Sequence, residues 1–166
     1  MFKKGSIVNY STTGVCKISE IITQTVSGQE RQYFCLLPVG KESNKILVPV
    51  DNEKLFAKMR SIPEKEVLEE LFAHAQELCA PWQENDIKRS ELFKDVIEVG
   101  KNEELLGIIG CIVKKRTELK VLSKNLKIAD NNALKTAERI LASTVSVVYS
   151  ITFEEAVKKI EGLFGS

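Results

Sequence analysis

The sequence predicts an α+β fold in which a small, strongly curved β-barrel is followed by a bundle of four to five helices. Up to residue 62, short apolar runs rich in β-branched and aromatic residues alternate with Gly-containing turns, which is typical of strands. Beyond it, long segments carry apolar residues at helical spacing. We therefore place a β domain at residues 1–62 and a helical domain at residues 63–166, with residues 63–80 as its first helix and connector.

Turn-forming residues separate four or five candidate strands in the first domain, of which Ala57–Ser61 is the optional fifth. Ser27-Gly28-Gln29-Glu30 predicts a hairpin with a four-residue loop, and Val39–Asn44 predicts a polar loop. Pro49 suits a strand end or an edge strand, because proline cannot donate to a central ladder. The predicted strands are Ser6–Tyr10, Val15–Val26, Arg31–Leu37, Lys45–Val50 and Ala57–Ser61.

The second domain shows two helix-start signals and several apolar stripes. Ser61–Glu64 and Thr152–Glu155 both have the spacing of a capping box. Gly107 and Gly110 lower helix propensity in the third helix but allow a neighbouring backbone to approach closely. The predicted helices begin after Ser61, after Trp82 with an end near Gly100, and at Leu105, Ala133 and Thr152.

Charge and cysteine usage describe an ordinary intracellular protein. The net charge is +1, yet six basic residues and a single acid, Glu118, lie between Lys114 and Lys127. Such a run is usually a solvated helix face. We expect a cytoplasmic protein, since the start of the chain carries no signal peptide and no apolar run is long enough to cross a membrane. The four cysteines lack C-x-x-C spacing, so we interpret them as buried thiols.

No catalytic motif is visible. The single histidine, His74, has no Cys or carboxylate partner at metal-ligand spacing, and the chain contains no G-x-S-x-G, P-loop or G-x-G-x-x-G after a strand. The sequence therefore predicts a binding module rather than an enzyme, with no cofactor and no metal.

Trp82 is the only tryptophan, and it follows the helix-stopping Pro81 at the seam between the two domains. Its ring either packs at the seam or is held out for a partner. An exposed edge of the predicted sheet could add a strand from another protein. The residues alone leave open whether the sheet edge and the basic run bind partners, or whether the first helix covers the edge and the run only solvates the helical bundle.

The first domain resembles the RNA-polymerase-interacting domain shared by the CarD/CdnL family of bacterial transcription regulators and the transcription-repair coupling factor. The second resembles the helical domain of the same regulators. The first resemblance rests on Phe2-Lys3-Lys4-Gly5, Val8-x-Tyr10, Gly14, Gly28-Gln29-Glu30, Tyr33, Ile46-x-Val48-Pro49-Val50-Asp51-Asn52 and Met59-Arg60. The second rests on Lys88-Arg89, Gly100, Lys114-Lys115-Arg116 and Ala137-Glu-Arg-Ile-Leu141.

For the first domain, the resemblance implies a Tudor-like, SH3-like barrel that binds the RNA polymerase β subunit. Gln24 and Leu47 stand where family members carry basic residues, so backbone pairing and apolar packing are expected to matter more in this chain. The residues implied to contact polymerase are Gln24, Val26, Lys45 and Leu47.

For the second domain, the resemblance implies a nucleoid-associated monomer whose tryptophan wedges into the minor groove and stabilises the open promoter. In this chain Glu84 and Asp86 follow the tryptophan and would repel phosphate, which predicts weak, non-specific binding. The alternative is a purely protein-binding polymerase adaptor whose helices do not touch DNA. The residues implied to contact promoter DNA are Trp82, Lys88, Arg89, Lys114, Lys115 and Arg116.

Overall fold

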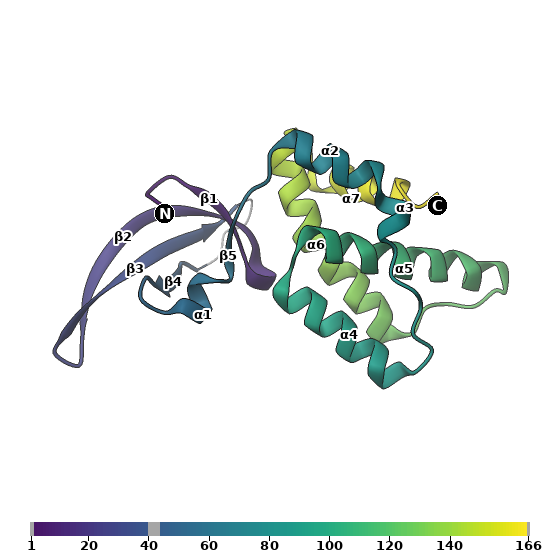
Figure 1. The fold of residues 1–166 in the computed structure, drawn as a ribbon, viewed down its shortest axis with the longest axis horizontal. Helices are drawn as coiled ribbons and strands as arrows, with labels where there is room; N and C mark the ends of the chain where they lie inside the picture. Colours follow the sequence, from purple (N-terminus) through teal and green to yellow (C-terminus); the bar gives the residue numbers. More distant parts are fainter. Residues whose placement is uncertain (1, 40–43, 166) are drawn as a thin grey trace. The chain divides into compact units, whose positions relative to one another are not determined.

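The computed structural model describes residues 2–39 and 44–165. The chain divides into two compact units, Met1–Ile62 and Pro63–Ser166, which we call the β unit and the helical unit. The α+β class is confirmed (Figure 1). Most of the predicted loop Val39–Asn44 lies outside the described residues.

The β unit is one five-stranded antiparallel sheet in the order β4-β3-β2-β1-β5. Its core contains Val8, Ile18, Phe34 and Val48, and the short helix α1 packs Phe56 against it. The elements are β1 (Ile7–Tyr10), a 3-10 turn (Ser11–Thr13), β2 (Gly14–Val26), β3 (Gln29–Pro38), β4 (Ile46–Pro49), α1 (Glu53–Phe56) and β5 (Met59–Ser61).

The predicted barrel is not closed. Among the described residues, β4 pairs with β3 and β5 pairs with β1, and these two edge strands do not pair with each other. They contain only four and three residues, which is too little ladder to close a barrel. Curvature comes instead from a register shift between Ile18 and Glu20, which bends the long β2–β3 hairpin (Figure 1).

The hairpin turn is shorter than predicted. Val26 pairs with Gln29, so only Ser27 and Gly28 form the loop rather than four residues. Both have positive φ, 52° and 78°, as a two-residue type I′ turn requires. Glu30 consequently belongs to β3, which sets the faces on which the hairpin side chains lie.

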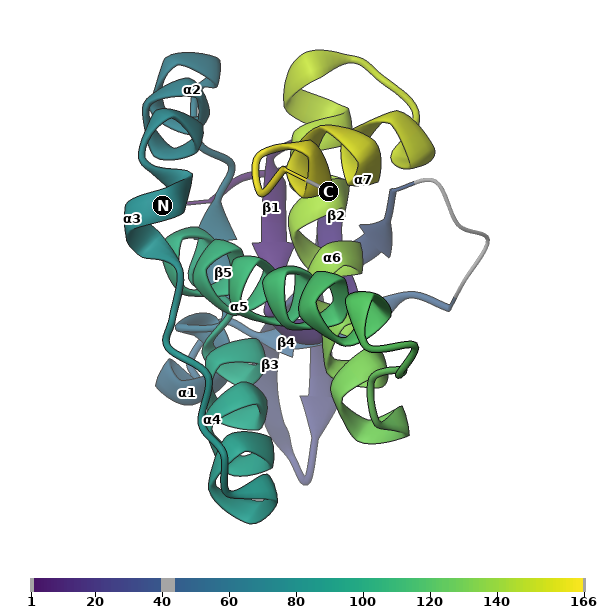
Figure 2. The same cartoon turned by 90° about the vertical axis from the view of Figure 1, so that its right-hand side faces the viewer.

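The helical unit is organised around α5 (Figure 2). Every residue from Leu105 to Val113 is buried, because neighbouring helices cover α5 on all sides over this stretch. The helices are α2 (Lys65–Ala73), α3 (Ala75–Leu78), α4 (Asp86–Val99), α5 (Asn102–Val121), α6 (Ile128–Tyr149) and α7 (Phe153–Gly162).

Two predictions for the first helix of this unit were wrong. The capping box at Ser61 does not form, because Ser61 pairs with Val8 in the sheet, and α2 begins after Glu64 without a side-chain cap. The first helix also breaks at His74, which lets α3 pack on α5 separately. The second capping box is confirmed: Thr152 and Glu155 each bond the other's backbone N–H.

Candidate functional site: the outer face of the β unit and the Trp82 pocket

One face of β2, β3 and β4 carries three of the four residues implied to contact polymerase. Residues directly opposite in an antiparallel pair lie on the same face, and successive residues alternate. Phe34 opposes Val48 on the core face, so Leu47, one residue away, lies on the other face. The same alternation places Gln24 and Val26 there. We call this surface the outer face; Ile22, Tyr33 and Pro49 also belong to it.

Lys45, the fourth residue, is engaged with Glu20. The Lys45 Nζ lies 3.3 Å from Glu20 Oε1, joining the segment before β4 to β2 across the intervening strand. Cys35 opposes Glu20 and is 1% exposed, and desolvation raises the pKa of its thiol. Both charged side chains are about half exposed, so the pair itself stabilises the fold by at most about 1 kcal/mol.

The outer edge of β4 offers a short backbone template. The Val50 N–H donates to Gln32 O at 3.0 Å, and the alternation of antiparallel bonding then turns the Leu47 backbone groups away from β3. Pro49 has no N–H, and its carbonyl accepts from Asn52. A partner strand added at this edge would pair through the N–H and C=O of Leu47. Ile22, Tyr33 and Pro49 were not predicted to lie on this surface. The alternation of side chains along each strand would have placed them on the same face as Leu47.

Trp82 lies in the segment 79–85, which connects α3 to α4 and which we call the strap. Its ring is half-buried and meets Phe93 of α4 edge-on, with ring centroids 6.4 Å apart. The guanidinium of Arg89 lies 4.4 Å from the Trp82 ring centroid, and the Nζ of Lys115 lies 5.3 Å from it. The ring is therefore partly covered by two cations of the protein itself.

Two glycines of α5 position the strap. A Cβ at Gly107 would lie 2.6 Å from the carbonyl oxygen of Leu78, and one at Gly110 would lie 2.5 Å from the Cys79 sulfur. The Ala80 N–H donates to Gly107 O at 3.1 Å. The predicted close approach of a neighbouring backbone is confirmed at Gly107, whereas the atoms nearest to Gly110 belong to the side chains of Cys79 and Phe164. Both contacts hold the segment that carries Trp82 against the central helix.

Arg89 is at the centre of a buried ion network. Its side chain binds Asp130 of α6 through Nε and NH2 at 2.8 and 2.9 Å, Asp86 at 2.8 Å, and the Gln83 carbonyl at 2.9 Å. Asp86 also pairs with Lys127. Hydrogen bonds from Lys127 and Arg89 lower the pKa of Asp86, and the bond to Asp130 raises the pKa of Arg89. At 3% exposure the Arg89 guanidinium is engaged inside the protein, so the predicted contact with DNA would require it to leave these partners.

The basic run of α5 does not form one free patch. Arg116 pairs with Glu161 of α7 at 3.1 Å, and Lys115 pairs with Glu118 at 3.5 Å while covering Trp82. Lys114 is half-buried, and Lys88 is exposed on α4. Of the three basic residues Lys114, Lys115 and Arg116, only Lys115 shares a pocket with Trp82.

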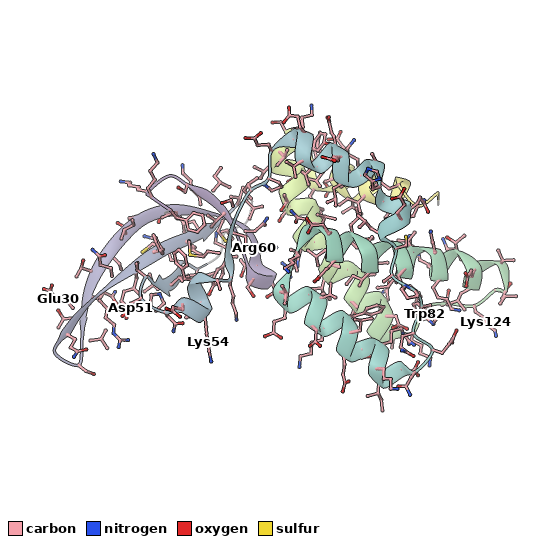
Figure 3. The ribbon with its side chains drawn as sticks, viewed as in Figure 1. Glu30, Asp51, Lys54, Arg60, Trp82 and Lys124 are labelled. Carbon is pink, nitrogen blue, oxygen red and sulfur yellow. The ribbon has the colours of Figure 1, made fainter. Side chains whose placement is uncertain are left out.

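A pocket surrounds Trp82, and two lysines that sequence reasoning did not single out belong to it. Lys124 and Lys127 come from the turn between α5 and α6, and Figure 3 shows Lys124 at the same end of the helical unit as Trp82. Both lysines belong to the run of six basic residues noted in the sequence, but only the fold shows that the turn carrying them lies against the strap. The lining residues are Trp82, Glu84, Asp86, Arg89, Lys115, Leu119, Lys124, Asn125, Lys127 and Asp130.

Arg116 also belongs to a carboxyl cluster that makes stability depend on pH. Glu138 of α6 is 8% exposed and bonds Glu161, and desolvation raises the pKa of Glu138 to about 8. Arg116 and Lys135 oppose this rise, whereas the bond from Glu138 lowers the pKa of Glu161. Glu138 is therefore the carboxyl group of the pair that retains its proton to higher pH.

We expect the free energy of unfolding to fall as pH rises from 4.5 towards 8, because Glu138 keeps its proton only when folded. The slope has an upper bound of about 1.4 kcal/mol per pH unit. Urea melts across this range should show that Glu138→Gln removes the fall, whereas the exposed control Glu98→Gln keeps it. Equal slopes in both variants would contradict the assignment. The lowered pKa of Glu161 acts only at lower pH, where its protonation destabilises the fold.

The described residues show neither a metal centre nor a membrane span. No group of three or more His, Cys, Asp or Glu side chains among them could hold a metal ion. No single helix in this part of the chain is long and apolar enough to cross a membrane. The helices α6 and α7 reach the necessary length and hydropathy only when taken together, and they are bent by 108° at the break between them. All four cysteines are free thiols, and Cys79 alone is not fully buried.

Comparison with known proteins identifies the first unit. Residues 2–62 match the family model of the CarD-like/TRCF RID domain, a stretch that includes all five strands and the outer face. A search of curated proteins finds no match to the chain.

Proposed function

We propose, from the CarD-like/TRCF RID domain that the chain contains at residues 2–62, that this protein is a transcription regulator that binds the RNA polymerase β subunit. The domain match is the observation that carries the proposal. The contact surface is the outer face together with the Leu47 edge of β4. The protein acts as a cytoplasmic, nucleoid-associated monomer, and a direct test is binding of the full chain to the purified β subunit.

The helical unit contacts promoter DNA through the Trp82 pocket and stabilises the open complex. Support comes from the amphipathic ring and from Lys115, Lys124 and Lys127 around it, which place positive charge where phosphates would lie. Carboxylates reduce this charge, because Lys127 pairs with Asp86 and Lys115 pairs with Glu118. Lys124 therefore contributes the positive charge of the pocket that these ion pairs do not offset. Lys88 and Lys114 are further phosphate contacts in this proposal, whereas Arg89 is a positioning residue for the Trp82 ring.

Trp82→Ala is expected to shorten the lifetime of open promoter complexes, since the deformed base step loses its support. The ring is only half-buried, so the loss of stability is expected to be about 1–2 kcal/mol, well below that of a core aromatic. Phe153→Ala is the matched control, because Phe153 is a 42% exposed aromatic on α7. Open-complex lifetimes and thermal melts should be measured on all three proteins.

A purely protein-binding adaptor is the second candidate. It is favoured by the internal ion pairs of Arg89 and Arg116 and by the carboxylate of Glu84 in the pocket, which reduce the charge available to DNA. Open-complex lifetimes equal for wild type and Trp82→Ala, together with no DNA binding at low salt, would establish the adaptor and reject the DNA contact.

A further inference from the structure

The most exposed apolar side chains in the described part of the protein lie at the ends of helices that border the Trp82 pocket. Ile87 and Ile128, 73% and 81% exposed, lie in the first turns of α4 and α6. Val121 and Leu122, 82% and 64% exposed, lie at the end of α5. Single exposed apolar residues are common and need no explanation, but four of them at helix ends around one pocket indicate a surface that binds a partner.

An ion network ties the starts of α4 and α6 together. Asp86, which precedes Ile87, pairs with Lys127, which precedes Ile128. Arg89 binds both Asp86 and Asp130, so it links the first turns of the same two helices. The network is partly buried and resists rearrangement, which holds Ile87 and Ile128 beside the Trp82 pocket as two apolar projections.

The charges around these projections select an anionic partner. Lys88 follows Ile87, Lys127 precedes Ile128, and Lys124 lies on the same pocket. Of the three acids that line the pocket, Asp86 pairs with Arg89 and Lys127, and Asp130 pairs with Arg89, which leaves Glu84 to oppose the lysines. A partner must therefore offer apolar surface and negative charge in close alternation, and the minor groove of duplex DNA does so through its sugars, base edges and phosphates.

We propose that Ile87 and Ile128 are further DNA contacts, inserted into the minor groove next to the base step that Trp82 supports. Isoleucine is among the side chains that serve as minor-groove wedges. Projecting side chains suit a groove in the partner, whereas an acidic amphipathic peptide would need a groove in this protein. The inference rests on the proposed DNA contact and extends it from one ring to three apolar side chains.

The test compares full-length variants binding a labelled duplex with a central mismatched pair and the same duplex fully paired. Wild type should prefer the mismatched duplex, because its step is easier to deform. Ile87→Ser/Ile128→Ser should weaken binding to the mismatched duplex by about tenfold and remove the preference, with the salt dependence unchanged. The matched control is Val67→Ser/Val99→Ser, whose side chains are 55% and 53% exposed elsewhere in the helical unit.

A second variant separates charge from apolar contact. Lys88→Gln/Lys124→Gln should flatten the salt dependence by up to about two phosphate equivalents and keep the preference for the mismatched duplex. If the isoleucine variant binds both duplexes like wild type while Trp82→Ala does not, the proposed function stands and this inference is wrong. Wild type that binds neither duplex would overturn both. Lost binding to the β subunit with intact DNA binding would assign the isoleucines to a protein partner and likewise overturn the inference.

Discussion

Arg89→Ala is expected to lower the free energy of unfolding by about 3–5 kcal/mol, because it leaves a buried charge without its partner. Asp130 is 2% exposed and takes two hydrogen bonds from Arg89, so the truncation leaves its carboxylate buried and uncompensated. The Trp82 ring also loses the guanidinium 4.4 Å from its centroid. Urea melts followed by tryptophan fluorescence would report both effects, since Trp82 is the only tryptophan.

Two further variants show whether the cost comes from the buried charge. Arg89→Met/Asp130→Leu removes both charges and should be less destabilising than Arg89→Ala alone, because no ion remains unpaired. Lys45→Ala breaks the exposed pair with Glu20 and should cost at most about 1 kcal/mol. A loss below about 1 kcal/mol for Arg89→Ala would show that the network does not hold α4 to α6.

Leu47→Glu is expected to weaken binding of the full chain to the RNA polymerase β subunit by about 2 kcal/mol or more, roughly thirtyfold in Kd. The change places a charge among the apolar residues of the outer face on the edge strand β4, at the residue whose backbone N–H and C=O turn away from β3. Titration calorimetry with the purified β subunit would measure the loss.

Ile21→Glu is the matched control for this substitution. Ile21 and Leu47 are both 42% exposed, but Ile21 pairs with Phe34 and therefore lies on the opposite face of the sheet. Binding should be retained by Ile21→Glu, and both variants should melt like wild type by circular dichroism. Equal losses in both variants would argue against the outer face as the contact surface, and wild-type binding by Leu47→Glu would place the interface elsewhere.

Much of the fold could be predicted because it depends on local periodicity. The β-branched residues of Val15–Val26 predict the strand β2, and the largely apolar run Leu105–Val113 predicts a helix, which the structure places at the centre of the helical unit. The start of α6 was placed at Ala133 rather than Ile128, because an 81% exposed isoleucine does not belong to the apolar stripe that marks a buried face. That error fell on Ile128, one of the two isoleucines that we propose contact DNA.

Two features depended on contacts between residues distant in sequence: whether the barrel closes, and which charged side chains form ion pairs inside the protein. Whether β4 meets β5 is set by strand length and register, which no local pattern encodes.

The sequence by itself determined the two kinds of unit, the helix through Leu105–Val113 and the family of residues 2–62, because periodicity and local motifs suffice for these. The tertiary structure alone decided which cations are free. Asp130 lies 41 residues from Arg89 and Glu161 lies 45 from Arg116, yet each neutralises its partner across helices. It also brought Lys124 and Lys127 to Trp82, because a pocket forms only when the strap, α5 and α6 pack together.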